Sequence, residues 1–410
     1  MTIVGGGMIG LWVAHHLRLR GVKVTVLERD RIGSGAARGN AGEVCPGLSG
    51  PLPAPGVIAA SLRTLHRSDS ALYVRPHPSA DLVRFLVGFA WHARADRYAA
   101  GVRALAELAG DAVEQYRQLE EGGIDVRIND RPYLTVFDSR ERAEEALEEL
   151  RRFFGEWVDV PERVLESDEL QALEPGLVDG LVGYAIGGQI TVDASAFVTS
   201  LAGRLREDGA EIVEGARVTA IRPMADGVAA QTTLGRFDAD AVVVTAGVWS
   251  PALAMTLGAR LPIIPGKGYS FSVSLDSPVR HLISVAPAHV ALAPMGQLTR
   301  VAGTMEIDRE YDRFDRRRVE AIVAAARPFI RGVTWDQRTS EWMGPRPMTS
   351  SGLPFLGALD AARRVYVAAG HNMLGVTLGP GTGRVMADLI LDGTAPIDVG
   401  PFQPPVRARG

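Results

Sequence analysis

Residues 2–30 read TIVGGGMIGLWVAHHLRLRGVKVTVLERD. This stretch opens with a short apolar run and passes directly into the turn Gly5-Gly6-Gly7-Met8-Ile9-Gly10. An amphipathic segment over 11–20 follows, and then a β-rich run over 22–27 that ends on Glu28. The order strand, glycine turn, helix, strand and acid predicts a βαβ unit that binds a dinucleotide.

The residue types in this turn suit distinct physical tasks. Gly5 permits the tight turn, Gly7 lets the backbone approach a pyrophosphate, and Gly10 lets the helix pack closely on its strand. The phosphates would accept hydrogen bonds from unpaired N–H groups at the positive end of the helix dipole. Glu28 lies at the spacing where a carboxylate can accept hydrogen bonds from ribose hydroxyls. The alternative is an ordinary βαβ packing turn without a cofactor, since glycine turns are common.

The bulk composition narrows the class of protein. A chain of 410 residues contains about two to three domain-sized units, and 46% hydrophobic and 22% charged residues are ordinary for a soluble globular protein. The net charge of −4 gives no reason to expect nucleic-acid binding. Cys45 is the only cysteine, which excludes an intrachain disulfide and a cysteine zinc site, and we expect no metal.

The expected location is the cytoplasm. The first predicted strand begins at the first residue, so we expect no secretory signal, and a single cysteine suits a reducing compartment. No run approaches the ~20 apolar residues that span a bilayer.

Hydrophobic periodicity indicates both helical and β segments along the chain. Helices are expected over about 79–119, 140–154 and 193–208, the last with Asp193 as its N-cap. An antiparallel sheet is indicated by alternating runs over 265–300. Further strands are expected over 133–137, 211–213, 217–221, 241–245 and 365–368.

Four separated segments together resemble the D-amino-acid oxidase/dehydrogenase family of flavoproteins. They are residues 2–30, GSGAARGNAG at 33–42 with CPG at 45–47, VVVTAGVW at 242–249, and WMGPRP at 342–347 with GHNMLGVTLGPGTG at 370–383. The similarity runs from end to end and is strongest to bacterial D-amino-acid dehydrogenase catalytic subunits. Cys45 departs from the family pattern, which has a small polar residue there.

The resemblance implies an α/β fold with FAD as the tightly bound cofactor. A glutathione-reductase-like FAD-binding Rossmann domain would be discontinuous, over 1–75, 190–255 and 340–410. An inserted α+β substrate-binding domain with an antiparallel sheet would take 76–189 and 256–339.

The resemblance also implies which residues contact FAD. The first segment would supply Gly5, Gly7, Met8, Ile9, Gly10, Glu28 and Arg29. The second would supply Ser34, Gly35, Ala36, Arg38, Asn40, Ala41 and Gly42. The remaining contacts would come from Val218, Ala246, Gly247, Trp249, Gly344, Gly370, Asn372, Met373, Gly375, Val376 and Thr377.

Three residues are candidates for the chemistry. Arg346 would bind the substrate carboxylate through two parallel charge-assisted hydrogen bonds, although a buried arginine joined to backbone or to an acid is the alternative. Tyr269 would make a second contact with the carboxylate or amine, unless it is a core aromatic. His371 would lie near the flavin ring or be a hydrogen-bonded structural histidine. Lys267 either contacts the flavin region or covers a sheet edge, and we expect the second.

Two further segments carry open alternatives. Residues 379–383 are expected to lead into a helix over 384–391 whose N-terminus points at the flavin pyrimidine edge and stabilises the reduced anion, unless they form an ordinary glycine-rich turn. Apolar residues crowd a helical run with arginines at either side, which is either core or a patch that touches a membrane surface. These residues are Arg84, Phe85, Leu86, Phe89, Trp91 and Arg94.

The resemblance implies oxidative deamination of a small amino-acid substrate. A D-amino acid would lose hydride from its α-carbon to flavin N5, and the imine would hydrolyse to a 2-oxo acid and ammonia. Electrons would pass to a quinone of the respiratory chain, at the inner face of the cell membrane, or to oxygen. Two alternatives stay open: a glycine, sarcosine or D-hydroxyproline type of secondary-amine oxidase or dehydrogenase, and a non-catalytic flavin subunit of a larger oxidoreductase. An oligomer or a partner subunit is compatible with each.

Overall fold

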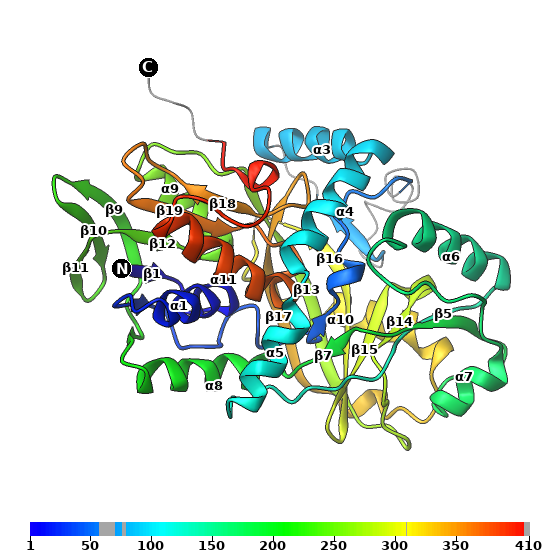
Figure 1. Cartoon of the computed structure of the whole chain (residues 1–410). Helices are drawn as coiled ribbons and strands as arrows, with labels where there is room; N and C mark the ends of the chain where they lie inside the picture. Colours follow the sequence, from blue (N-terminus) through cyan, green and yellow to red (C-terminus); the bar gives the residue numbers. More distant parts are fainter. Residues whose placement is uncertain (57–69, 76–78, 309, 406–410) are drawn as a thin grey trace.

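The computed structural model describes residues 1–56, 70–75, 79–308 and 310–405 (Figure 1). Its first sheet has six strands in the order β18-β19-β12-β1-β2-β8, and every neighbouring pair except β18–β19 is parallel. The strands are β1 (Thr2–Val4), β2 (Thr25–Leu27), β8 (Glu211–Val213), β12 (Val242–Val244), β18 (Phe355–Ala358) and β19 (Val365–Ala369). The Rossmann-type parallel sheet predicted from the sequence is confirmed.

Strand β1 lies at the centre of this sheet. Ile3 pairs with Val26 of β2 on one side and with Val243 of β12 on the other. These side chains are fully buried, as expected for parallel strands that are covered on both faces. Because β12 and β19 come from far along the chain, the N-terminal unit is completed only by residues 242–244 and 365–369.

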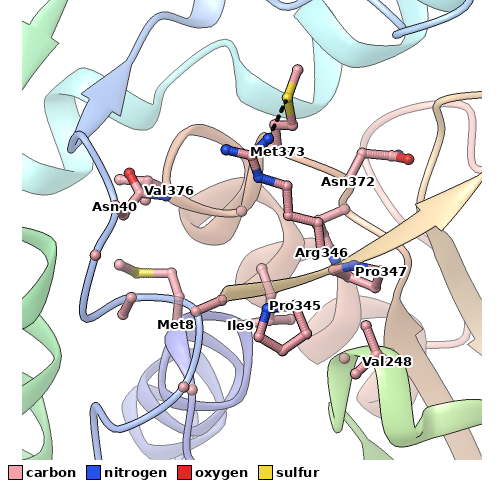
Figure 2. A pocket seen from close by; sticks show the side chains of 18 of the residues that line it. Met8, Ile9, Asn40, Val248, Pro345, Arg346, Pro347, Asn372, Met373 and Val376 are labelled. Atoms are coloured by element: carbon pink, nitrogen blue, oxygen red, sulfur yellow. Dashed lines mark hydrogen bonds between the residues drawn. The ribbon is translucent and has the colours of Figure 1, made fainter. Parts of the chain in front are cut away.

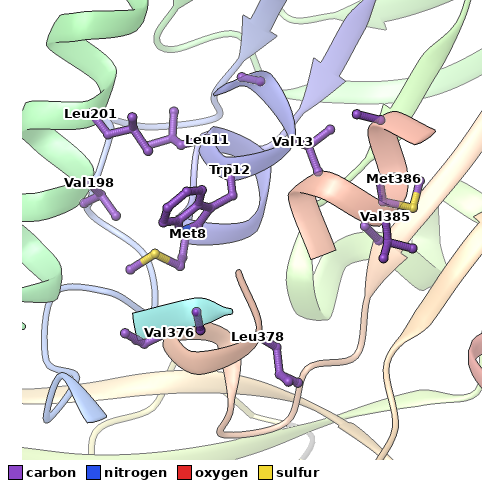
Figure 3. Close-up of a cluster of buried hydrophobic side chains, with 14 of the residues drawn as sticks. Met8, Leu11, Trp12, Val13, Val198, Leu201, Val376, Leu378, Val385 and Met386 are labelled. Atoms are coloured by element: carbon purple, nitrogen blue, oxygen red, sulfur yellow. The ribbon is translucent and has the colours of Figure 1, made fainter. Parts of the chain in front are cut away.

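Three helices pack together over this sheet. Helix α1 (Met8–Leu19) contacts both α8 (Ala194–Glu207) and α11 (Gly375–Leu391), and Trp12 is buried between them (Figure 3). The Trp12 ring lies 5.5 Å from that of Phe197 on α8. Helix α8 is capped as predicted, since Asp193 accepts hydrogen bonds from the backbone N–H groups of Ser195 and Ala196.

Helix α11 corrects the predicted helix over 384–391. It begins at Gly375, so residues 379–383 are helical and lie in its interior, and the expected N-terminus at these glycines was wrong. Pro380 removes one helical N–H donor, and the carbonyl of Val376 four residues earlier accepts a hydrogen bond of 2.9 Å from the Tyr116 hydroxyl. Tertiary packing therefore overrides the low helix propensity of this segment.

The glycines of α11 serve close helix packing. A Cβ added at Gly381 would collide with the carbonyl oxygen of Leu108. A Cβ added at Gly383 would lie 2.6 Å from the carbonyl oxygen of Trp12. Both contacts are with backbone, which cannot move aside as a flexible side chain can.

The second sheet is largely antiparallel, as predicted, and runs in the order β17-β13-β16-β15-β14-β5-β6, with β4 paired to β16. The β14–β5 and β16–β4 pairs are parallel. Helix α10 (Arg316–Ala326) covers one face. The strands are β4 (Leu72–Val74), β5 (Tyr133–Phe137), β6 (Val182–Ile186), β13 (Ile263–Val273), β14 (Ile283–Val285), β15 (Val290–Met295), β16 (Leu298–Ile307) and β17 (Thr339–Thr349).

The remaining elements connect or flank the two sheets. The predicted helices over 79–119 and 140–154 and the strand over 133–137 are confirmed. The predicted strand over 217–221 is confirmed as β9, which extends to Met224. The other helices are α3 (Ala80–His92), α4 (Ala95–Ala109), α5 (Ala112–Glu121), α6 (Arg140–Phe154), α7 (Ser167–Leu173) and α9 (Ser250–Met255), and the other strands are β3 (Glu43–Val44), β7 (Ile190–Thr191), β9 (Val218–Met224), β10 (Gly227–Thr232) and β11 (Gly235–Ala239).

Helices α4 and α5 join the core of the first sheet. Leu105 and Leu108 of α4 and Tyr116 of α5 are buried in one cluster with residues of α1 and α11. The domain boundaries predicted from the sequence place these helices in the substrate-binding domain. The division of the chain into two domains stays a prediction. Their packing shows that the span 76–189 also supports the dinucleotide-type sheet.

Gly381→Ala is expected to lower the free energy of unfolding by about 1–3 kcal/mol, because the new methyl group meets the Leu108 backbone. Gly203→Ala on α8 is the matched control, since no heavy atom lies within 4 Å of a Cβ added there. It should be neutral or stabilise by up to about 1 kcal/mol. Urea unfolding of the two variants measures the difference, and equal midpoints would contradict the packing assignment.

Candidate active site

A cavity of about 1250 Å³ opens at the carboxyl ends of β1, β12 and β19 and extends to the second sheet. Val4, Thr245 and Ala369 border it at the ends of the three strands. Ligands of open parallel sheets bind at this edge. The volume exceeds the usual range of roughly 300–1,000 Å³ for ligand pockets, which leaves room for a large cofactor together with a substrate.

The glycine turn is shaped as its sequence predicts. Gly5 has a φ of +110°, and a Cβ there would lie 2.8 Å from the carbonyl oxygen of Thr245. A Cβ at Gly7 would meet no atom within 4 Å, and no side chain caps the N-terminus of α1. The first N–H groups of α1 are therefore available to an anion, and Met8 and Ile9 border the cavity beside them (Figure 2).

Glu28 stabilises this turn through hydrogen bonds. Its Oε2 accepts a hydrogen bond of 2.8 Å from the N–H of Gly6, and its Oε1 accepts one of 2.9 Å from the N–H of Asp30. The carboxylate also borders the cavity, where further lone pairs can meet ribose hydroxyls.

Arg29 and Trp249 form a second wall near Glu28. The Arg29 guanidinium lies 4.0 Å from the centre of the Trp249 ring, and the indole N–H donates a hydrogen bond of 3.0 Å to the Tyr311 hydroxyl. Val218 borders the same cavity. This flat, partly cationic surface suits the adenosine half of a dinucleotide.

Most of the other predicted FAD contacts also border the cavity. They are Ser34, Gly35, Ala36, Asn40, Ala41, Ala246, Gly247, Gly370, Asn372, Met373, Gly375, Val376 and Thr377. Asn372 shapes its loop in the left-handed region, since its φ is 53° and its side chain donates to the carbonyls of Gly370 and Gly352.

Four predicted contacts lie outside the cavity lining, and three of them are glycines at close contacts within the protein. A Cβ added at Gly10 would collide with the carbonyl of Gly5, and one added at Gly42 would collide with the carbonyl of Val192. A Cβ added at Gly344 would collide with the Trp342 ring. These glycines permit close packing. The side chain of Arg38 is exposed to solvent.

Arg346 is a half-buried cation at the cavity with weak partners. Its Nη1 lies 3.4 Å from the Thr304 carbonyl oxygen and 3.4 Å from the Met373 sulfur (Figure 2). Its guanidinium lies over Gly268, where an added Cβ would collide with it. Burial lowers the pKa of Arg346 to about 10, and the negative charge of Glu43 opposes this shift. Among the described residues it forms no ion pair, so its N–H fork is available to a carboxylate.

Tyr269 and His371 border the cavity, but their polar groups form hydrogen bonds with other side chains of the protein. The buried Tyr269 hydroxyl donates a hydrogen bond of 2.8 Å to Glu306, and the ring packs in the core beneath α10, which favours the core-aromatic alternative. His371 lies 3.0 Å from the Thr382 hydroxyl. Burial lowers the pKa of His371 to about 3, so the ring is neutral at physiological pH, which favours the structural alternative.

Lys267 corrects the expectation that it covers a sheet edge. It is fully buried, and its ammonium lies 3.0 Å from Asp308 and 3.3 Å from Glu306. It belongs to a buried ion cluster of the second sheet.

Sequence reasoning missed one polar wall of the cavity. Glu43, Cys45, Tyr133 and Ser284 all border it, although the sequence analysis singled out only Cys45, as a departure from the family pattern. The available signal was the position of Glu43, a lone acid directly after the Asn40–Gly42 segment in an otherwise apolar and glycine-rich stretch.

The apolar run on α3 divides between core and surface. Phe85 and Phe89 are buried against Met305 and Met348, whereas Trp91 is 51% exposed. None of the described helices is long and apolar enough to cross a membrane. Contact of this run with a membrane surface stays a prediction.

Comparison with known proteins agrees with this geometry. Residues 1–389 match the model of the DAO family, described as FAD dependent oxidoreductase. The chain belongs to this family. Its cofactor is FAD, which the uncapped N-terminus of α1, the open space at Gly7 and the braced Glu28 fit.

Relatives and solved structures extend the similarity over the whole chain. D-amino acid dehydrogenase of Cereibacter sphaeroides is 33% identical over 97% of this chain and 92% of the relative, and that of Agrobacterium fabrum is 30% identical over 97% of each. The crystal structure of glycine oxidase from Geobacillus kaustophilus superposes with a TM-score of 0.75 at 25% identity, covering 100% of this chain and 98% of that one. The resemblance predicted from the sequence is confirmed.

Gly7→Val is expected to weaken FAD binding at least about tenfold without destabilising the apoprotein. Gly7 has the extended backbone angles φ −82° and ψ −173°, which valine adopts, and the side chain would fill the open space at the start of α1. Flavin absorbance per protein and apoprotein unfolding are the measurements. Gly187→Val, at an equally open position, is the control and should keep its flavin. Full flavin content in Gly7→Val would contradict the site.

The stability of the protein should depend on pH through His371. Its folded pKa lies near 3, below the ordinary value of 6.5, so the unfolded chain takes up a proton first as the pH falls. This contribution is complete above about pH 6.5 and is lost toward pH 3, by about 1.4 kcal/mol for each pH unit. His371→Gln should flatten this part of the wild-type profile of unfolding free energy against pH. Parallel profiles would exclude the effect.

Proposed function

We propose that this protein is a D-amino-acid dehydrogenase or oxidase that deaminates its substrate oxidatively. The single observation that carries the proposal is the half-buried Arg346 guanidinium, which borders the same cavity as the FAD-binding turn and has no ion-pair partner among the described residues. The names of the relatives support the D-amino acid as substrate class.

Arg346 binds the α-carboxylate in this proposal. Two parallel N–H donors fix the plane of the carboxylate and so determine which face of the α-carbon is presented to the cofactor. Partial burial strengthens this contact, since few waters compete for the guanidinium. The sulfurs of Met373 and Met305 are weak acceptors for the guanidinium, which exchanges them for the stronger carboxylate when the substrate binds.

Bound FAD would supply the electron sink for the hydride that leaves the α-carbon when the amine is neutral. The resulting imine takes up water and releases ammonia, leaving a 2-oxo acid. His371 borders the cavity as a neutral side chain hydrogen-bonded to Thr382, because its pKa lies near 3. A quinone or oxygen would serve as the final electron acceptor.

A secondary-amine oxidase is the second candidate. The glycine oxidase structure that superposes over the whole chain at 25% identity favours it. Anaerobic flavin bleaching against D-, L- and N-alkyl amino acids separates the two, and reoxidation by oxygen or by a quinone analogue separates oxidase from dehydrogenase. A bound flavin that no amine reduces would indicate an electron-transfer subunit instead.

Arg346→Met is expected to lower kcat/KM at least about 30-fold, mainly through a higher KM, and to leave FAD bound. Arg346→Lys should recover only part of this loss, since lysine lacks the planar fork. In the wild type, KM should rise as the pH passes about 10, where Arg346 loses its charge. Steady-state kinetics on D-alanine with a dye acceptor measure these effects, and unchanged kinetics in Arg346→Met would remove Arg346 from the site.

A further inference from the structure

On the Arg346 side of the cavity the lining also includes an acidic side chain, Glu43, which interacts electrostatically with Arg346. Glu43 lies on the short strand β3, which is fixed to the start of α11 because the Thr377 hydroxyl donates a hydrogen bond of 3.0 Å to the Glu43 carbonyl. The Glu43 carboxylate accepts no hydrogen bond and forms no ion pair within the described part of the chain. It interacts electrostatically with Arg346 without contacting it.

The neighbours of Glu43 do not neutralise it. Cys45 and Tyr133 interact with it, and the Tyr133 side chain is hydrogen-bonded to that of Ser284. Burial raises the pKa values of the Cys45 thiol and the Tyr133 hydroxyl well above their ordinary values, so both are uncharged at neutral pH. Burial also raises the pKa of Glu43, as it does for a carboxylate that lacks a cationic partner.

Short side chains leave room between the two charges. Ser284 on β14, Ala291 on β15 and Ala302 on β16 are direct partners in the sheet, and all three border the cavity. Arg346 reaches β16, where it contacts Thr304 and Met305, whereas Glu43 lies beside residues of β14 and β5. Two strand spacings, roughly 10 Å, separate these places.

Two ends of one substrate can therefore meet two opposite charges. A carboxylate bound by Arg346 leaves its side chain to extend over the row of small residues toward Glu43. Glu43 is half-buried, and a carboxylate partly removed from water without a partner carries a free-energy cost, which a cation that arrives with the ligand lowers. A carboxylate next to the reacting amine would instead keep that amine protonated and oppose departure of the hydride, so Glu43 fits the far end of the substrate.

Building on the proposed function, we infer that Glu43 binds a positively charged side-chain group and makes this enzyme selective for basic D-amino acids. Its role is recognition of the substrate at the end away from the reacting carbon.

The pair D-arginine and D-citrulline tests this inference, because the two differ little in shape and differ in charge. The wild type is expected to show a kcat/KM at least about 30-fold higher for D-arginine. Glu43→Gln should remove most of this preference, chiefly through the KM for D-arginine, while kcat/KM for D-citrulline changes less than about threefold. Glu148→Gln on α6 is the matched control, because it removes one negative charge from an exposed position. This variant should keep the wild-type preference.

The outcomes separate the inference from the function on which it depends. Flavin content and anaerobic bleaching by D-alanine are measured first for each variant, so a misfolded protein is recognised. Equal use of D-arginine and D-citrulline by an active wild type would overturn the inference and leave the proposed function standing. An equal loss for all substrates in Glu43→Gln would also overturn it, since it would place Glu43 at the α-amine. Failure of every amino acid to reduce bound flavin would overturn the proposed function itself.

Discussion

The close approach of α1 to β1 is the contact on which the rest of the molecule depends. At Gly10 the helix comes so near the Gly5 carbonyl that no side chain fits between them. This contact directs the uncapped start of α1 to the carboxyl edge of the sheet, where the cavity begins. Trp12, on the same helix, packs against the glycines of α11, so one short helix positions both the cofactor end and the C-terminal end of the site.

Much of the fold could be predicted from local patterns. Two segments with a clear local pattern, the strand over 133–137 and the helix over 140–154, were predicted at their observed bounds. Helix α11 was not, because the partners that make its first turns helical lie elsewhere. The Tyr116 hydroxyl and the Leu108 backbone come from other helices, and no local rule contains them.

Site residues whose role depends on backbone geometry could be predicted from the sequence. Residues whose role depends on the direction of the side chain were harder to predict. Gly5, Gly7 and Glu28 border the cavity as expected. Tyr269 follows an irregularity in the pairing of β13 with β16, and such a bulge changes which face a side chain takes. Glu43 was missed because a single acid on a two-residue strand carries no periodic signal. Its importance comes from the wall of β5 and β14 that it faces, more than 85 residues away in sequence.

The central position of β1 has a consequence for how this chain is made. Its neighbour β12 leaves the ribosome more than two hundred residues after it, and α11 is among the last segments to emerge. Throughout that time the hydrophobic surface of the first thirty residues lacks its native cover. Folding therefore requires contacts between residues far apart in sequence. Such contacts form slowly, and the intermediates expose hydrophobic surface that is prone to aggregation. A nascent chain interrupted before residue 375 would hold every glycine of the phosphate turn and still lack the helix that packs behind it.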